Sequence, residues 1–269
     1  MKVFDLHNDV LTEVKNYKLE IENYPKNCKV VTAIYRGEKT FKEVENILSN
    51  YNKIKSKKTY LAFEDIGYND LDLNKIILYN PLYVSLTHNK ENALGYGVNF
   101  NCDLKEKGIE VIKFLNQTNI TLDVAHLSQK ATYRAINLAN KVICSHTAFN
   151  GVYQNKRNLD DGVIRDIIYK NGIIGLCFVG YFLCESNANI YSVIKHIEYF
   201  LGKFGDDNLV IGSDFNGTDY LPYNLNNYLD FFTLKNKLLK LGYSKKTIDK
   251  IFYKNAQKYF FKIGETCKK

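Results

Sequence analysis

The chain has 269 residues, 45% of them hydrophobic and 25% charged, which is the composition of an ordinary soluble globular protein. No window approaches the ~20 continuous apolar residues of a membrane span, and no basic region followed by an apolar stretch opens the chain, so we expect a cytoplasmic protein with no membrane partner. The net charge of +8 comes from scattered lysines without a basic stripe, which argues against a nucleic-acid partner.

Eight apolar runs rich in β-branched residues are typical of buried strands. They are residues 2–9, 29–35, 59–64, 81–88, 119–126, 142–146, 173–179 and 208–214. The connection after the first run is polar, and we expect it to be irregular. Apolar residues at helical spacing predict helices over residues 41–51, 73–78, 109–115, 131–138, 163–168, 190–201, 225–241 and 244–261. Thr40 with Glu43 forms a capping-box pair, and Ser128 is placed to cap the helix that follows it.

Eight strands alternating with helices over about the ~250 residues usual for the architecture predict a (β/α)8 TIM-like barrel. A doubly wound open sheet is the alternative arrangement of the same elements. The sequence contains no internal repeat, low-complexity linker or charge block, so we expect residues 1–269 to form a single domain.

Polar side chains collect where these strands end, which is the face that carries the active site in such a barrel. They are His7, Asp9, Glu64, His88, His126, His146 and Asp214. Each has a structural explanation of its own: His126 could be a core histidine, and the acids could cap helices. Those explanations do not account for imidazoles and carboxylates from different strands gathering at one rim, so convergence favours a metal site. The fifth histidine, His196, lies in a predicted helix and is interpreted as structural or solvated.

Imidazole and carboxylate ligands without thiolates suit Zn²⁺ or a similar divalent ion in an open, catalytic site. Five candidate ligands, namely His7, Asp9, Glu64, His126 and His146, are too many for one open zinc. They fit two divalent ions that share a bridging carboxylate. Two ions ~3.5–4 Å apart would hold a metal-bridging hydroxide at neutral pH.

A spaced set of motifs across nearly the whole chain resembles the membrane (renal-type) dipeptidases, peptidase family M19, in the form of a short cytoplasmic bacterial-type member. The motifs are Asp5-Leu6-His7-Asn8-Asp9, Leu86-Thr87-His88-Asn89, Leu122-Asp123-Val124-Ala125-His126-Leu127-Ser128, Cys144-Ser145-His146, Lys156-Arg157-Asn158-Leu159-Asp160-Asp161 and Ile211-Gly212-Ser213-Asp214-Phe215-Asn216-Gly217. The resemblance implies a zinc-dependent amidohydrolase-like barrel that cleaves dipeptides, including those with a C-terminal D-residue.

The resemblance also implies a ligand set. It assigns His7 and Asp9 to one zinc, Glu64 to the bridge, and His126 with His146 to the other zinc. The family usually has a Gly-Gly pair after the bridging glutamate, whereas Asp65 and Ile66 follow Glu64 here. Asp65 is therefore the alternative carboxylate for the bridge.

Three further roles follow from the resemblance. His88 would bind the oxygen of the scissile carbonyl, Arg157 would bind the substrate carboxylate, and Asp214 would transfer the proton. From its sequence context alone, Arg157 is a surface arginine in a polar loop.

Two other functions remain open from the sequence. A related binuclear metallohydrolase would use the same metals on another amide, a lactone or an N-acyl amino acid. A non-catalytic metal-binding barrel would use the rim for a partner, but it would have no need of Asp214 for proton transfer. A homodimer is compatible with the sequence, which does not define the oligomeric state.

Overall fold

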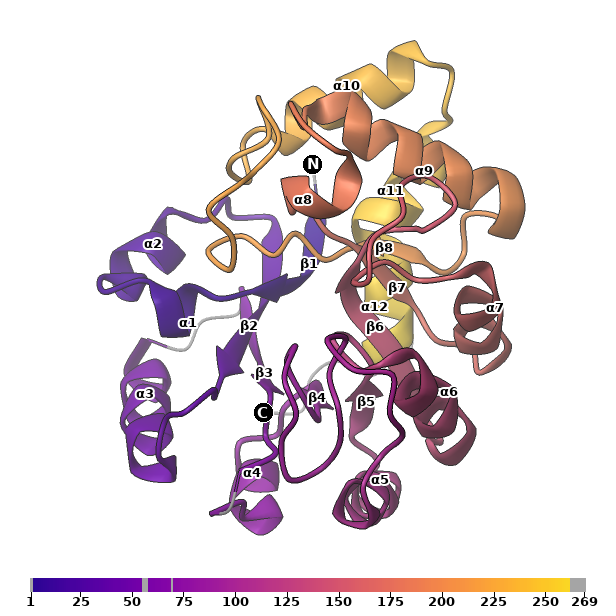
Figure 1. Ribbon diagram of the computed structural model, residues 1–269. Coiled ribbons are helices and arrows are strands. Elements are labelled where there is room, and N and C mark those ends of the chain that lie inside the picture. The colour runs from indigo at the N-terminus through magenta and orange to yellow at the C-terminus, as the bar shows by residue number, and fades with distance from the viewer. Residues whose placement is uncertain (1, 55–57, 69, 262–269) are drawn as a thin grey trace.

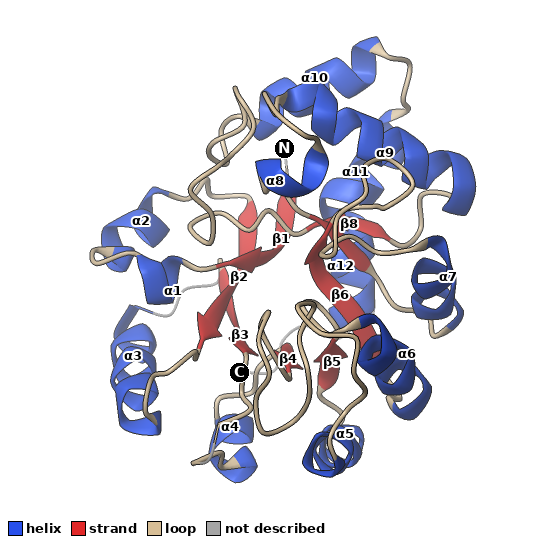
Figure 2. Cartoon of the chain, viewed as in Figure 1, coloured by secondary structure: helices blue, strands red, loops and turns tan. Residues whose placement is uncertain are grey.

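The computed structural model describes residues 2–54, 58–68 and 70–261. Within these ranges eight parallel strands close into a barrel in the order β1 to β8, which confirms the predicted (β/α)8 fold. The strands are β1 (Val3–Asn8), β2 (Cys28–Tyr35), β3 (Thr59–Glu64), β4 (Tyr83–Ser85), β5 (Thr121–Asp123), β6 (Val142–Thr147), β7 (Ile174–Leu176) and β8 (Leu209–Ile211). Figures 1 and 2 show the strands at the centre of a ring of helices.

The helices that the structure describes alternate with these strands and cover the outside of the barrel. They are α1 (Val10–Glu13), α2 (Tyr17–Asn23), α3 (Phe41–Ile54), α4 (Leu73–Leu78), α5 (Glu106–Thr118), α6 (Gln129–Leu138), α7 (Asp161–Tyr169), α8 (Gly180–Leu183), α9 (Ile190–Phe204), α10 (Phe231–Lys240), α11 (Lys245–Asp249) and α12 (Asn255–Phe260), with the π-helical segment η1 (Lys250–Lys254) between the last two. The predicted caps form: the Thr40 N–H donates to Glu43 over 2.7 Å, and Ser128 accepts from the Ala131 N–H over 3.2 Å.

The connection after β1 differs from the prediction of irregular chain, because it contains α1 and α2. The side chain of Asn8 accepts a hydrogen bond from the Val10 N–H over 2.8 Å, which satisfies a backbone group at the start of α1. Val10 and Leu11 of α1 and Ile21 of α2 are buried. A few buried apolar residues stabilise these short helices, and such sparse contacts leave little periodicity in the sequence.

The C-terminal region also differs from the prediction. The expected helix over residues 225–241 begins only at Phe231, because Asp230 accepts hydrogen bonds from the N–H groups of Asn226 and Asn227 and holds a turn there. The expected helix over residues 244–261 is α11, η1 and α12 in succession. Four predicted strands, at residues 81–88, 119–126, 173–179 and 208–214, are shorter, since their last residues leave the barrel and form rim loops.

The interior of the barrel is apolar below the rim, with Phe4, Leu6 and Tyr83 among its buried residues. Phe260 and Phe261 at the end of α12 pack against this cluster from the N-terminal side of the strands. The barrel is therefore closed at its base by aromatic side chains, and the loops after the strands surround the opposite end. No described helix is long and apolar enough to cross a membrane.

Candidate metal centre

The structure brings the five predicted ligands together at the C-terminal end of the barrel. His7 and His146 lie on β1 and β6, and Glu64 ends β3. Asp9 directly follows β1, and His126 lies three residues after the end of β5. All five side chains are buried. The ligand atoms form overlapping groups in which all atoms lie within 4.8 Å of one another. One group is His7, Asp9 and Glu64, and another is Glu64, His88 and His126.

Glu64 lies between two pairs of these residues. One oxygen, Oε2, is 3.7 Å from His7 Nε2, and that nitrogen is 3.3 Å from Asp9 Oδ2. The other oxygen, Oε1, is 3.1 Å from His126 Nε2 and 3.8 Å from His146 Nε2. One carboxylate thus faces both pairs, which is the arrangement that a bridge between two ions requires. Asp65, the alternative bridge, turns its carboxylate to Asn92 instead.

The second nitrogen of each histidine is held by a neighbour. His7 Nδ1 lies 2.9 Å from the Tyr83 hydroxyl. That hydroxyl donates its own proton to the Leu6 carbonyl over 2.7 Å, so it must accept from His7 Nδ1–H. His126 Nδ1 donates to Asn89 Oδ1 over 2.8 Å in the same way.

His146 is oriented through two further residues. Its Nδ1 lies 2.8 Å from Ser145 Oγ, and that hydroxyl donates to Asp123 Oδ2 over 2.5 Å. A neighbour therefore accepts from the Nδ1–H of each ring, and the Nε2 atoms of all three rings face the site, as in metal-binding histidines. The Nε2 atoms of His126 and His146 are only 2.8 Å apart, so their lone pairs share one small space.

Several buried atoms at the rim lack a hydrogen-bond partner, and three of them are His7 Nε2, Asp9 Oδ1 and Glu64 Oε1. An unpaired buried polar group costs about 1–3 kcal/mol, so three converging on one point indicate a missing partner. Burial lowers the pKa of His7, but the charges of Asp9 and Glu64 outweigh it and raise the value to about 10. Burial also lowers the pKa of His146 well below its usual range, which keeps that imidazole neutral. The donor set and its charge fit divalent cations.

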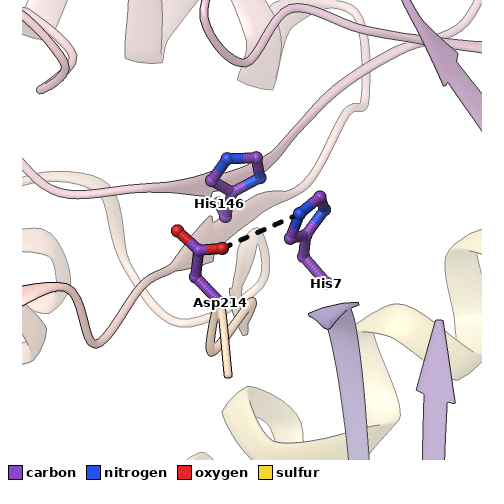
Figure 3. Close-up of side chains that lie close together, drawn as sticks. All are labelled: His7, His146 and Asp214. Atoms are coloured by element: carbon purple, nitrogen blue, oxygen red, sulfur yellow. Dashed lines mark ion pairs between the residues drawn. The ribbon is translucent and has the colours of Figure 1, made fainter. Parts of the chain in front are cut away.

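Asp214 approaches the same centre from the loop after β8. Figure 3 shows its carboxylate facing His7, with Asp214 Oδ1 3.8 Å from His7 Nε2. Burial raises the pKa of Asp214 to about 7, although the positive charge of His7 opposes this shift. Asp214 and His126 adopt left-handed backbone conformations with φ of 62° and 67°. Such conformations cost about 1–3 kcal/mol each in non-glycine residues and concentrate at functional sites.

Gly217 allows the backbone after β8 to approach the carboxylates. A Cβ atom at this position would lie 2.3 Å from Asp9 Oδ2 and 2.4 Å from Asp214 Oδ1. Any larger residue would therefore displace the two acids, so the glycine is required for the site to form.

A cavity of about 650 Å³ lies over the centre. Its lining includes Asp9, Glu64, His88, His126, His146 and Asp214, with Tyr35 and Tyr181 also lining it. The ring of His88 is 4.0 Å from that of His126, and burial, assisted by the charge of Arg157, lowers the pKa of His88 to about 4.

Arg157 is buried beside the centre and is not a surface residue as its local sequence suggests. Its Nη2 donates to the His146 carbonyl over 3.3 Å, its guanidinium lies 5.3 Å from the centroid of the Phe182 ring, and its Nε has no partner. It lines a smaller adjoining cavity of about 240 Å³, which shares His126 with the larger one. Arg157 is not among the residues that line the larger cavity.

His196 is a buried core histidine on α9, as the structural interpretation predicted. Its Nδ1 accepts from the Phe149 N–H over 3.2 Å, so its Nε2–H donates to the Leu183 carbonyl over 3.1 Å. The residues that sequence reasoning missed are the supporting ones: Tyr83, Asn89 and the Asp123–Ser145 pair. Asp123 and Ser145 stand inside the motifs beside His126 and His146, which is the signal that could have revealed them.

The sequence model of the family described as membrane dipeptidase (peptidase family M19) matches residues 8–269. A protein of Klebsiella pneumoniae named for the pqqA 5′ region is 29% identical over 181 residues, which are 62% of this chain and 66% of that protein. The dipeptidase verJ of Clonostachys rogersoniana is 26% identical over 193 residues, 70% of this chain and 50% of that protein. The matches thus span less than two thirds of each relative's length.

A solved structure supports the same fold. The metallopeptidase of Rhodobacter sphaeroides, bound to a phosphinate mimic of the dipeptide L-Ala-D-Ala, superposes with a TM-score of 0.79. The match covers 97% of this chain and 98% of the Rhodobacter protein at 18% sequence identity. At that identity, the likeness establishes the barrel architecture.

Proposed function

The chain belongs to the membrane dipeptidase family, peptidase family M19, and on that premise we propose that it hydrolyses dipeptides with the help of two divalent ions, zinc being the preferred metal. The observation that carries the proposal is the position of Glu64 between the His7–Asp9 and His126–His146 pairs, with Glu64 Oε1 buried and unpartnered. The verJ relative is itself named a dipeptidase, and the Rhodobacter protein binds a dipeptide mimic.

In the proposed site, His7 and Asp9 would hold one ion, His126 and His146 would hold the other, and Glu64 would contact both. Ions bound there would lower the pKa of a water molecule to about 7 and would polarise the scissile carbonyl. Tyr83, Asn89 and Ser145 keep the three imidazoles in the tautomer that presents Nε2. The protein thus supplies a preorganised ligand set with little reorganisation on binding.

Asp214 moves the proton in this proposal. Its carboxylate takes a proton from the attacking water and gives it to the leaving amine, a general base and then general acid role. A pKa of about 7 suits both halves of that cycle, since the group gains and loses a proton near neutral pH.

His88 binds the carbonyl oxygen. Because its pKa is lowered to about 4, the imidazole is neutral at physiological pH and donates a hydrogen bond through its remaining N–H. That hydrogen bond becomes stronger as negative charge develops on the oxygen, so it stabilises the transition state more than the bound substrate.

Arg157 binds the carboxylate of the C-terminal residue. A buried guanidinium with an unpartnered Nε has donors available for a planar, bidentate partner. We include a C-terminal D-residue among the substrates, because the Rhodobacter protein binds a mimic of L-Ala-D-Ala.

The test compares a free-acid dipeptide with its C-terminal amide in the zinc-loaded protein and in Arg157→Ala and Arg157→Lys. Hydrogen bonds to charged groups contribute ~1.5–3 kcal/mol each, so amidation should lower kcat/KM by about ten-fold or more in the wild type. Arg157→Ala should reduce hydrolysis of the free acid much more than that of the amide, and Arg157→Lys should restore part of it. Arg165→Ala, which removes an exposed arginine on α7, is the matched control.

Equal losses on both substrates would remove Arg157 from carboxylate recognition. One observation favours the second candidate function in that case: Arg157 lines the smaller cavity and not the one above the centre. The protein would then be a binuclear metallohydrolase for another amide, a lactone or an N-acyl amino acid. Product analysis with those compounds distinguishes the two functions.

A further inference from the structure

Asp65 occupies an unusual position directly after the bridging candidate Glu64. Its backbone adopts φ of 57°, a conformation that glycine reaches without cost and that other residues rarely adopt. Asp65 is only 4% exposed, and a carboxylate this deeply buried is expected to have hydrogen-bond partners. The groups of metal-ligating atoms among the described residues contain Glu64 but not Asp65.

The carboxylate of Asp65 is bound to the segment that carries His88. Its Oδ1 accepts from Asn92 Nδ2 over 2.8 Å. Its Oδ2 accepts from the Tyr68 hydroxyl over 3.0 Å. The turn after β4 is therefore tied, through Asn92, to the side chain that directly follows β3.

Asn92 extends this connection through the rest of the turn. Its Nδ2 also donates to the Leu86 carbonyl over 2.7 Å, and its Oδ1 accepts from the N–H groups of Leu94 and Gly95 over 2.8 and 3.2 Å. A Cβ atom on Gly67 would lie 2.1 Å from the Asn92 side chain, so a glycine there makes room for it. The polar atoms of Asn92 are fully used in holding residues 86–95 to the end of β3.

We propose that Asp65 is a positioning residue, whose carboxylate fixes residues 86–95 and thereby sets the His88 imidazole at a defined place relative to Glu64. The effect on turnover rests on the proposed role of His88, whereas the effect on the segment itself does not. A hydrogen-bond donor for a transition state must be held within a few tenths of an ångström to be effective, and neighbouring hydrogen bonds provide that constraint.

Asp65→Gly separates this role from a purely backbone one, because glycine relieves the left-handed conformation. If residue 65 mattered only for the backbone, the variant would be at least as stable and as active as the wild type. If the carboxylate positions His88, kcat should fall about 10–100-fold, as losses of supporting groups do, with two ions still bound and KM little changed. Asp65→Asn keeps one acceptor oxygen and should recover part of the loss.

Asn80→Gly is the matched control. Asn80 is exposed, follows α4 and has φ of 49°, so the same replacement by glycine occurs away from the site. This variant should leave kcat unchanged. A second measurement is independent of substrate: amide hydrogen exchange across residues 86–95 should accelerate in Asp65→Gly and not in Asn80→Gly.

A double-mutant cycle with His88→Ala completes the test. If Asp65 acts through His88, Asp65→Gly should lower kcat by less than two-fold when His88 is already absent. Unchanged exchange in Asp65→Gly, or an equal loss of kcat with and without His88, would overturn the proposal. A wild-type protein that cleaves no dipeptide would instead contradict the proposed function, and the exchange measurement would still decide whether Asp65 holds the segment.

Discussion

The polar groups at the two ends of the barrel differ in whether their hydrogen-bonding atoms have partners. At the base, the ammonium of Lys29 lies 5.3–5.7 Å from the centroids of four rings, those of Phe4, Tyr60, Tyr253 and Phe261, and donates to Gln257 Oε1 over 2.9 Å. At the rim, His7, Asp9 and Glu64 each leave a buried atom without a partner. The polar group at the base has its partners within the protein, whereas the rim has buried ligand atoms without partners. Residues that stabilise the fold and residues that carry the function therefore lie at opposite ends of the barrel axis.

Between the two ends lies a layer of two buried carboxylates, each of which is hydrogen-bonded to a serine. Asp5 of β1 accepts from the Ser213 N–H and hydroxyl over 2.7 and 2.5 Å, and Asp123 of β5 accepts from the Ser145 N–H and hydroxyl over 2.8 and 2.5 Å. Each pair joins neighbouring strands just below a metal-ligand candidate. These four residues are buried, and they support the loops and strand ends that carry the metal-ligand candidates. Substitutions in this layer should therefore lower metal affinity more than they lower the free energy of unfolding.

The largest expected effect comes from Glu64→Gln, which removes the charge that faces both histidine pairs. We expect turnover to be lost and the metal content to fall below two ions per chain, a greater effect than the ~10–100-fold loss caused by removing a supporting group. Metal analysis and kcat are measured together, with Glu45→Gln on the outer helix α3 as the control. Near-normal metal content and turnover in Glu64→Gln would show that another carboxylate bridges the ions.

Asp214→Asn should have the next largest effect. The amide keeps the shape of the side chain but cannot carry a proton, so kcat should fall roughly 10²–10⁴-fold while metal content and thermal stability stay close to those of the wild type. The exposed Asp207 provides the control variant Asp207→Asn. If the metal content fell in proportion to the rate, Asp214 would be chiefly a metal ligand.

The metal-ligand candidates could be predicted from the sequence, but the residues that support them could not. Each ligand candidate stands at the end of an apolar run, and parallel strands end together, so spacing alone predicted that His7, Glu64 and His126 would meet. Their partners were not predictable in this way. Tyr83 supports His7 from 76 positions away, and a hydroxyl inside an apolar strand leaves no periodic signal. The same limit hid the turn at Asp230, where side-chain bonds compete with helix formation.

Tyr83→Phe tests whether the rim depends on the side chains beneath it. The ring and its packing remain, but His7 Nδ1 loses its acceptor, and the tautomer that presents Nε2 is less favoured. We expect a 10–100-fold loss of metal affinity, measured by competition with a chelator, and little change in the melting temperature of the metal-free protein. Tyr60→Phe at the base is the matched control, and equal affinities in the two variants would show that His7 is oriented without Tyr83.

The smallest effect should come from Lys29→Met, which tests the other half of the comparison. Methionine keeps an apolar stem among the four rings but removes the cation, and such contacts contribute ~0.5–2 kcal/mol. Gln257 Oε1 keeps a donor, since the Tyr253 hydroxyl lies 2.9 Å away, so no acceptor is left unpaired. We therefore expect a loss of about 1 kcal/mol in the free energy of unfolding, measured by denaturant titration, with kcat and metal content unchanged. Lys29→Met could instead lower metal affinity as much as Tyr83→Phe does. The two ends of the barrel would then be coupled, and the assignment of stability to the base and of metal binding to the rim would be wrong.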